Sequence, residues 1–182
     1  MSQANVVFFD LETQKSADEV GGWKNIHLMK MSVGVVYETG PGEYRVFEED
    51  QVQDLIAALK AADMVVGFNV IRFDYTVLSG YTPEDLTQIP TFDLLQDLER
   101  RLGHRVKLDD VASATLGTSK SGHGLQALRW WKEGKVQEII DYCRQDVKVT
   151  KEVYEFGVDR GFVSFFSRYG GKERVPVQWP KL

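Results

Sequence analysis

Near its N-terminus the chain reads Asn5-Val6-Val7-Phe8-Phe9-Asp10-Leu11-Glu12-Thr13, a short apolar run that leads directly into two acids. An apolar run of this length, rich in Val and Phe, predicts a strand that is buried on both faces. Because side chains alternate along a strand, Asp10 and Glu12 are expected to point to the same side at its end. Two carboxylates this close resist joint ionisation, and a divalent cation between them relieves the repulsion. The stretch therefore predicts a site for a hard cation such as Mg²⁺.

The composition is that of an ordinary globular protein. The chain has 182 residues, of which 43% are hydrophobic and 27% charged, which fits one domain with a sizeable core. Because Cys143 is the only cysteine and no signal peptide is recognisable, we expect an intracellular, cytoplasmic location. No apolar run reaches membrane-spanning length, so no membrane association is expected. The net charge of -5 argues against a protein that coats nucleic acid through bulk positive charge.

Downstream, strand and helix signals alternate before the chain becomes mainly helical. After a loop over residues 14–30, the patterns predict strands over residues 31–37, 44–47 and 64–68, the first two joined by a turn at residues 40–42. Helical spacing of apolar residues predicts helices over residues 50–62, 73–80, 91–102, 108–116, 125–131 and 136–156. A terminal hairpin is possible in the tail, although Pro176 and Pro180 disfavour it. This order predicts an α/β fold with helices packed on a mixed sheet.

A further acid, Asp74, follows the predicted strand that ends near Gly67, at the start of a helix. Carboxylates in that position are common as helix N-caps, and Asn69 could likewise be a turn residue. The alternative is that both serve the same site as Asp10. The sequence leaves both interpretations open.

The longest predicted helix carries Asp146 on a face that also holds Ile139 and Cys143. An acid on an apolar helix face is costly to bury unless it is paired or binds a metal. Tyr142 lies four residues earlier and projects from the same face. For Tyr142 the alternative is core packing with its hydroxyl bonded to Asp146.

Together these acids favour phosphodiester hydrolysis. Four carboxylates at the end of a sheet can hold two magnesium ions, and two ions about 4 Å apart clamp the attacking and leaving oxygens of a phosphoryl displacement. A phosphoaspartate receiver fits less well, because acids that alternate on a strand end suit metal bridging better.

Three segments resemble the motifs of the DEDD 3′-5′ exonucleases of the ribonuclease H-like superfamily. Residues 8–13 match the first motif, residues 67–74 the second, and residues 142–146 the third in its tyrosine form. The likeness covers residues 6–156 and is greatest to the proofreading exonuclease domains of family B DNA polymerases and to small helicase-associated relatives. It implies a ribonuclease H-like α/β fold with a mixed five-stranded sheet flanked by helices. The chain would then form a single domain, residues 1–182, with residues 157–182 as a C-terminal extension.

The resemblance also implies roles for individual residues. Two Mg²⁺ ions, which Mn²⁺ could replace, would be held by the four acids Asp10, Glu12, Asp74 and Asp146. Tyr142 would orient the nucleophilic water, since a tyrosine of ordinary pKa is a poor base at neutral pH. The histidine branch of the family places its base where this chain has Asp141, so the tyrosine branch is favoured.

The resemblance also implies substrate contacts at the ends of the two motif strands, and one basic loop is a further candidate. The backbones of Leu11 and Thr13 would hold the terminal nucleotide, and Asn69 and Phe73 would contact substrate. Lys120 lies in a basic segment with several Gly and Ser residues, which could grip the phosphate backbone or could simply be a solvated loop. Of Trp130 and Trp131, one is expected in the core and the other on the surface, where it could stack on bases.

Three functions remain to be separated. The first is a metal-dependent 3′-5′ exonuclease acting on single-stranded DNA ends in replication or repair. The second is a structure-selective endonuclease on the same fold, and the third is a non-catalytic domain that binds nucleic acid or a partner. DNA is favoured over RNA, and a helicase or a polymerase is a possible partner.

Overall fold

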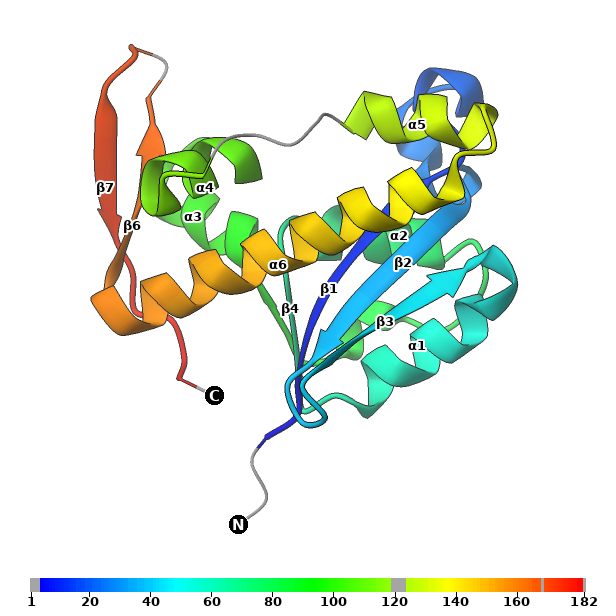
Figure 1. Ribbon diagram of the computed structural model, residues 1–182, viewed down its shortest axis with the longest axis horizontal. Coiled ribbons are helices and arrows are strands. Elements are labelled where there is room, and N and C mark those ends of the chain that lie inside the picture. Colours follow the sequence, from blue (N-terminus) through cyan, green and yellow to red (C-terminus); the bar gives the residue numbers. More distant parts are fainter. Residues whose placement is uncertain (1–3, 119–123, 168, 182) are drawn as a thin grey trace.

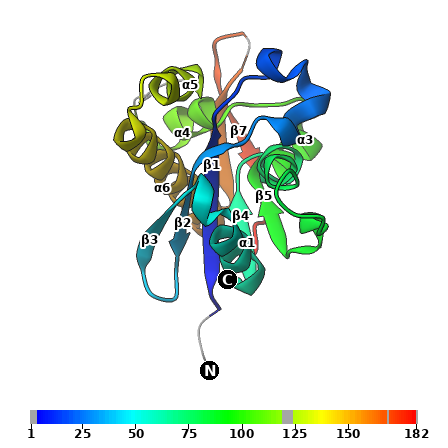
Figure 2. The same cartoon turned by 90° about the vertical axis from the view of Figure 1, so that its right-hand side faces the viewer.

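The computed structural model describes residues 4–118, 124–167 and 169–181. Its main sheet has five strands in the order β3-β2-β1-β4-β5, with β1 in the centre (Figures 1 and 2). β2 runs antiparallel to β1 and to β3, whereas β4 runs parallel to β1 and to β5. The predicted mixed five-stranded sheet flanked by helices is therefore confirmed. The strands are β1 Val6–Thr13, β2 Met31–Glu38, β3 Glu43–Glu48, β4 Met64–Gly67 and β5 Thr91–Asp93.

Side-chain alternation along β1 divides the core into two layers. Val6 and Phe8 belong to the hydrophobic cluster beneath the long C-terminal helix, and Val7 and Phe9 belong to the cluster on the opposite face. All four side chains are buried, as a strand covered on both faces requires. Asp10 and Glu12 continue the register of Val6 and Phe8, so their side chains are directed to the face that the long helix covers.

The helices cover the sheet unequally. Two helices contribute buried residues to the cluster that contains Val7 and Phe9. They are α1 Val52–Ala61 and α2 Tyr75–Leu78. Those with buried residues in the Val6 cluster are α3 Leu94–Leu102, α4 Leu108–Leu116, α5 Gly124–Lys132 and α6 Val136–Arg160. Short helical turns occupy Asp18–Val20 and Trp23–Leu28 within the predicted loop, and also Glu49–Gln51 and Leu86–Gln88.

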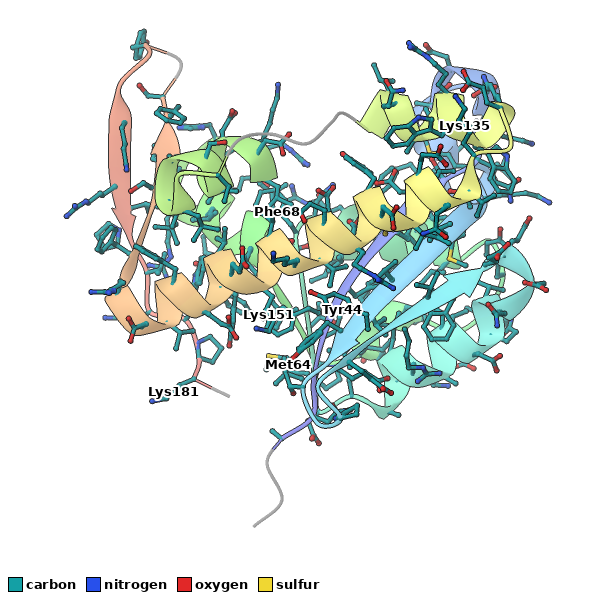
Figure 3. The ribbon with its side chains drawn as sticks, in the orientation of Figure 1. Tyr44, Met64, Phe68, Lys135, Lys151 and Lys181 are labelled. Atoms are coloured by element: carbon teal, nitrogen blue, oxygen red, sulfur yellow. The ribbon has the colours of Figure 1, made fainter. Side chains whose placement is uncertain are left out.

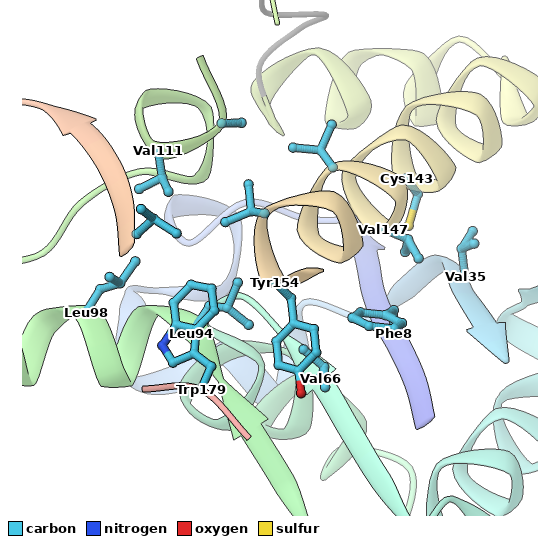
Figure 4. Close-up of a cluster of buried hydrophobic side chains, with 14 of the residues drawn as sticks. Phe8, Val35, Val66, Leu94, Leu98, Val111, Cys143, Val147, Tyr154 and Trp179 are labelled. Atoms are coloured by element: carbon cyan, nitrogen blue, oxygen red, sulfur yellow. The ribbon is translucent and has the colours of Figure 1, made fainter. Parts of the chain in front are cut away.

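Helix α6 crosses β1 and β2 and fixes the geometry of that face (Figure 1). Its inner residues Cys143, Val147 and Tyr154 pack toward Phe8 in the core (Figure 4). The Lys151 ammonium of α6 lies over the Tyr37 ring of β2, and the Arg144 guanidinium lies over the Tyr44 ring of β3. Figure 3 labels Lys151 and Tyr44. These contacts hold the middle of α6 against the sheet.

The C-terminal residues form the hairpin that the sequence left open. β6 Phe162–Phe166 pairs antiparallel with β7 Lys172–Pro176 as a separate two-stranded sheet, and Pro176 takes its last position. Trp179 then stacks on Tyr154 with ring centroids 6.0 Å apart, above Gly157, where a Cβ would meet the indole at 2.3 Å. β6 packs on α4 and α6, and the segment after the hairpin is anchored on α6 by Trp179.

The prediction of a helix over residues 91–102 was wrong at its start. Residues Thr91–Asp93 form β5, and α3 begins only at Leu94. The Asp93 carboxylate accepts the backbone N–H groups of Leu95 and Gln96, so it caps the helix. The predicted helix over residues 73–80 is likewise shorter: a π-helical turn, Val70–Asp74, precedes α2.

Across the described residues, none of the helices combines the length and apolar character that crossing a membrane requires.

Candidate metal centre

Three carboxylates converge where β1 ends. One oxygen from each of Asp10, Glu12 and Asp146 lies within 4.8 Å of the others, and all three side chains are half-buried. β1 supplies the first two, and α6 supplies the third across the face described above. We call these three residues the carboxylate cluster.

The end of β1 separates from its parallel neighbour, which opens space at the cluster. β1 pairs with β4 only from Val6 to Phe8, and its register with β2 shifts between Glu12 and Thr13. Such irregularities re-aim side chains and are frequent next to active sites.

Asp74 is held where β1 and β4 part. Its side chain is only 2% exposed, and its Oδ1 accepts the backbone N–H of Leu11 at 3.0 Å. Its side chain thus binds a backbone group of β1. The N-cap alternative is not realised, because no cap bond from the Asp74 side chain to α2 forms.

Asn69 is fixed from two sides. It adopts a left-handed backbone conformation with φ of +68°, its N–H donates to Asp93 at 2.8 Å, and its side-chain oxygen accepts a bond from Arg105 at 3.1 Å. Asn69 is thus a turn residue and also a residue that lines the cleft, so its two alternatives do not exclude each other.

Burial and like charge make the cluster reluctant to ionise. The pKa values of Asp10 and Glu12 are raised well above the ordinary range, first by burial and then by neighbouring carboxylates. The pKa of Asp74 is raised for the same reasons, with Asp10 the main charged neighbour. A divalent cation would reduce the charge repulsion between these carboxylates.

Tyr142 lies at the edge of the cluster and packs edge-on against Trp130, with ring centroids 6.2 Å apart. Burial, followed by the charges of Asp146 and Glu12, raises the pKa of Tyr142 above its usual value. The hydroxyl therefore stays protonated at neutral pH and can donate a hydrogen bond, whereas it is unsuited to act as a base.

Cys143 is a contact that the sequence did not reveal. Its buried thiol donates to the backbone oxygen and the carboxylate of Asp10, each at 3.4 Å. Burial raises the pKa of this thiol well above its usual range, which agrees with a packing residue and not a nucleophile. Its position three residues before Asp146, on the same helix face, was the available signal.

The cleft around the cluster has a volume of about 920 Å³. Leu11, Thr13, Asn69, Phe73, Asp74 and Tyr142 line it with the cluster, so these predicted site residues lie together. Lys120 lies outside the described residues. Trp130 and Trp131 are both half-buried against the core, so the expected division between core and surface was wrong. Residues that line the cleft but were not singled out include Trp23, Lys107 and Leu125.

The donor set fits a divalent metal ion. Three carboxylate oxygens within 4.8 Å of one another provide the hard oxygen ligands that Mg²⁺ and Mn²⁺ prefer. Elsewhere in the described residues, no other group of three His, Cys, Asp or Glu side chains meets this geometry.

The family model for the RNase H superfamily matches residues 7–157, so the chain belongs to that superfamily. The ribonuclease H-like superfamily and fold class that the motifs predicted are therefore confirmed.

Among solved structures, the fold is similar to that of the family B DNA polymerase from the hyperthermophilic archaeon Pyrobaculum calidifontis, with a TM-score of 0.63 and 19% identity. The match covers 86% of this chain and 25% of the polymerase, so the chain spans about a quarter of that protein. At 19% identity the likeness is evidence for the fold alone. No curated protein matches the sequence. Superfamily membership and the carboxylate cluster together support a nuclease-type function.

Proposed function

We propose that this protein is a metal-dependent 3′-5′ exonuclease that hydrolyses phosphodiester bonds at single-stranded DNA ends. The observation that carries the proposal is the convergence of Asp10, Glu12 and Asp146 beside Tyr142 in one cleft. The likeness of the motifs to proofreading exonucleases of the tyrosine type supplies the direction of degradation.

The cluster would hold two Mg²⁺ ions, which Mn²⁺ could replace, with Asp10 as the shared ligand. Bound divalent ions of this kind acidify water and neutralise charge that develops on the phosphate. Asp74 would complete the ligand set from its place beside Asp10. Its bond to the Leu11 N–H connects the Asp74 side chain to the backbone of β1 between Asp10 and Glu12.

The other predicted residues would bind and orient. The protonated Tyr142 hydroxyl would donate to the water or to a phosphate oxygen and so fix its orientation. Leu11 and Thr13 would hold the terminal nucleotide through backbone groups, and Asn69 and Phe73 would contact it from the facing side of the cleft. Lys120 is proposed to contact the phosphate backbone.

The proposal extends to context. We propose an intracellular protein that acts on DNA in replication or repair, with a helicase or polymerase as partner. We also propose that residues 1–182 act as one exonuclease domain, in which residues 157–182 extend the catalytic core.

A degradation assay tests the function directly. A 5′-labelled single-stranded DNA oligonucleotide with Mg²⁺ or Mn²⁺ should give a ladder that shortens from the 3′ end. EDTA and the Asp146→Ala variant should each abolish the ladder. Cleavage of circular single-stranded DNA would instead establish the endonuclease alternative. If neither DNA nor a matching RNA oligonucleotide is cut with either metal, the catalytic proposal fails and a binding role replaces it.

A further inference from the structure

A second, smaller pocket adjoins the cleft. The loop between α3 and α4 and the end of β6 enclose about 370 Å³, lined by His104, Arg105, Val106, Lys107, Asp110, Phe166 and Ser167. We call it the loop pocket. Lys107 lines both the loop pocket and the cleft, so the two hollows meet at this residue.

Two basic residues of the loop pocket carry charge that no ion pair with a described residue neutralises. Nearby basic residues are paired, Arg72 with Glu99 and Arg101 with Asp97. Within the described residues, Arg105 and Lys107 form no ion pair, and the guanidinium of Arg105 bonds only to the neutral side chain of Asn69. Positive charge therefore remains available beside the carboxylate cluster, in a protein whose net charge is -5.

The hairpin adds an aromatic surface to this positive charge. Phe166, at the end of β6, keeps 46% of its surface exposed and lines the loop pocket. Ser164 of β6 exchanges two hydrogen bonds with the Thr115 hydroxyl of α4, at 2.9 and 3.0 Å, which fixes the strand beside the helix. The hairpin stands next to α3 and α4 in Figure 1, on the side away from α5. Phe166 is thus an exposed ring on a strand that two hydrogen bonds attach to α4.

We propose that the loop pocket binds the nucleic-acid strand that leads into the cleft. Lys107 and Arg105 contact consecutive phosphates, and Phe166 stacks against a base. Cations that track the backbone, combined with an exposed ring, form the combination by which proteins bind single strands without reading sequence. This inference rests on the proposed function, because it takes the end of the same strand to lie at the carboxylate cluster.

Binding without cleavage tests the inference. Fluorescence anisotropy in EDTA would compare ten-nucleotide oligothymidine and oligouridine on wild type and on the double variant Arg105→Gln, Lys107→Gln. We expect affinity to fall about tenfold or more, and the log–log salt slope to shrink by about 1.4, since each single-strand phosphate contact contributes about 0.7. The charge-keeping pair Arg105→Lys, Lys107→Arg should retain the wild-type slope. The Phe166→Leu variant should weaken binding about fivefold with an unchanged slope.

Arg100→Gln is the matched control. Arg100 is an exposed cation in the last turn of α3 outside both hollows, so its variant should bind as wild type does. Equal binding by wild type and the double variant would overturn the inference, as would a wild type that binds neither oligonucleotide.

The two proposals fail in different ways. If wild type shortens DNA but the double variant binds normally, the loop pocket is not a strand-binding site and the exonuclease proposal is retained. If wild type cuts neither oligonucleotide but its binding depends on Arg105 and Lys107, the exonuclease proposal is contradicted and the strand-binding proposal is retained.

Discussion

Two groups of carboxylates in this molecule, one buried and one half-buried, differ in what surrounds them. Asp93 and Asp97, which we call the α3 acids, are 5% and 8% exposed. The carboxylate of Asp93 accepts four backbone N–H groups, and that of Asp97 accepts bonds from Arg101 and Trp179. In the carboxylate cluster, by contrast, Asp10, Glu12 and Asp146 face one another.

The difference shows what each group is suited to do. Donors supplied by the protein make the α3 acids part of the framework, where they cap a helix and hold the turn at Asn69. Like charges that meet in a cleft lower the stability of the metal-free fold, and a bound divalent cation would offset this repulsion. We therefore expect changes at the α3 acids to affect stability and changes in the cluster to affect catalysis.

The largest effect is expected for Asp10→Ala. Losing a ligand of the metal centre removes several kcal/mol of transition-state stabilisation, so turnover of a DNA oligonucleotide should fall by at least about a thousandfold. The control is Asp141→Ala, an exposed acid on α6 five residues before Asp146. Its turnover should match that of wild type. Loss of turnover in Asp141→Ala would mean that the histidine-branch position contributes after all.

Asp93→Ala, a change at one of the α3 acids, should lower stability more than it lowers catalysis. It leaves four backbone N–H groups without their acceptor, and we expect the free energy of unfolding to drop by about 2–4 kcal/mol. Urea denaturation monitored by circular dichroism measures this. Per folded molecule, turnover should change far less than in Asp10→Ala; a collapse of activity with unchanged stability would contradict the division.

Tyr142→Phe isolates the hydroxyl. The ring can keep its edge-on contact with Trp130, so folding should be preserved. Loss of one orienting hydrogen bond predicts a decrease of about tenfold in single-turnover rate. Because burial and nearby acids raise the pKa of Tyr142, no rate change between pH 6 and 9 should trace to its ionisation. If Tyr142→Phe keeps the wild-type rate, the hydroxyl of Tyr142 has no catalytic role and the residue serves only in packing.

The smallest effect has the opposite sign. Asp10→Asn removes one of the like charges, so in EDTA at pH 8 its Tm should exceed that of wild type by a few degrees, about 1 kcal/mol. The raised pKa values of Asp10 and Glu12 set the pH dependence. Because their pKa values are higher in the folded state, these groups contribute to folding stability in full only below the ordinary carboxyl pKa near 4. The contribution is lost as the pH rises through the pKa values of the folded state. Thermal unfolding at several pH values should show the Asn variant gaining most at high pH.

Much of the fold could be predicted because local patterns coincide with tertiary requirements. The apolar run at residues 6–9 is continuous because α1 and α6 cover both faces of β1, and alternation then directs Asp10 and Glu12 toward α6. The spacing of Tyr142 and Asp146 placed both on one helical face. These residues line one cleft in the structure, and their catalytic roles stay predictions.

What could not be predicted depends on contacts between distant residues. Thr91–Asp93 has too few residues to show a strand period, and only its pairing with β4 defines it as β5. The bond from Leu11 to Asp74 exists because β1 and β4 separate beyond Phe8, which no local pattern encodes. The loop pocket combines residues of the α3–α4 loop with Phe166, about sixty positions later in the chain.

Calorimetric titration of Mn²⁺ into metal-free protein tests the central claim most directly, because it needs no substrate. We predict saturable binding to wild type that Asp10→Asn and Asp146→Asn abolish, while Asp141→Asn binds as wild type does. Wild type that binds no divalent ion, or that binds equally well without Asp10 and Asp146, would contradict the assignment of the carboxylate cluster as a metal centre.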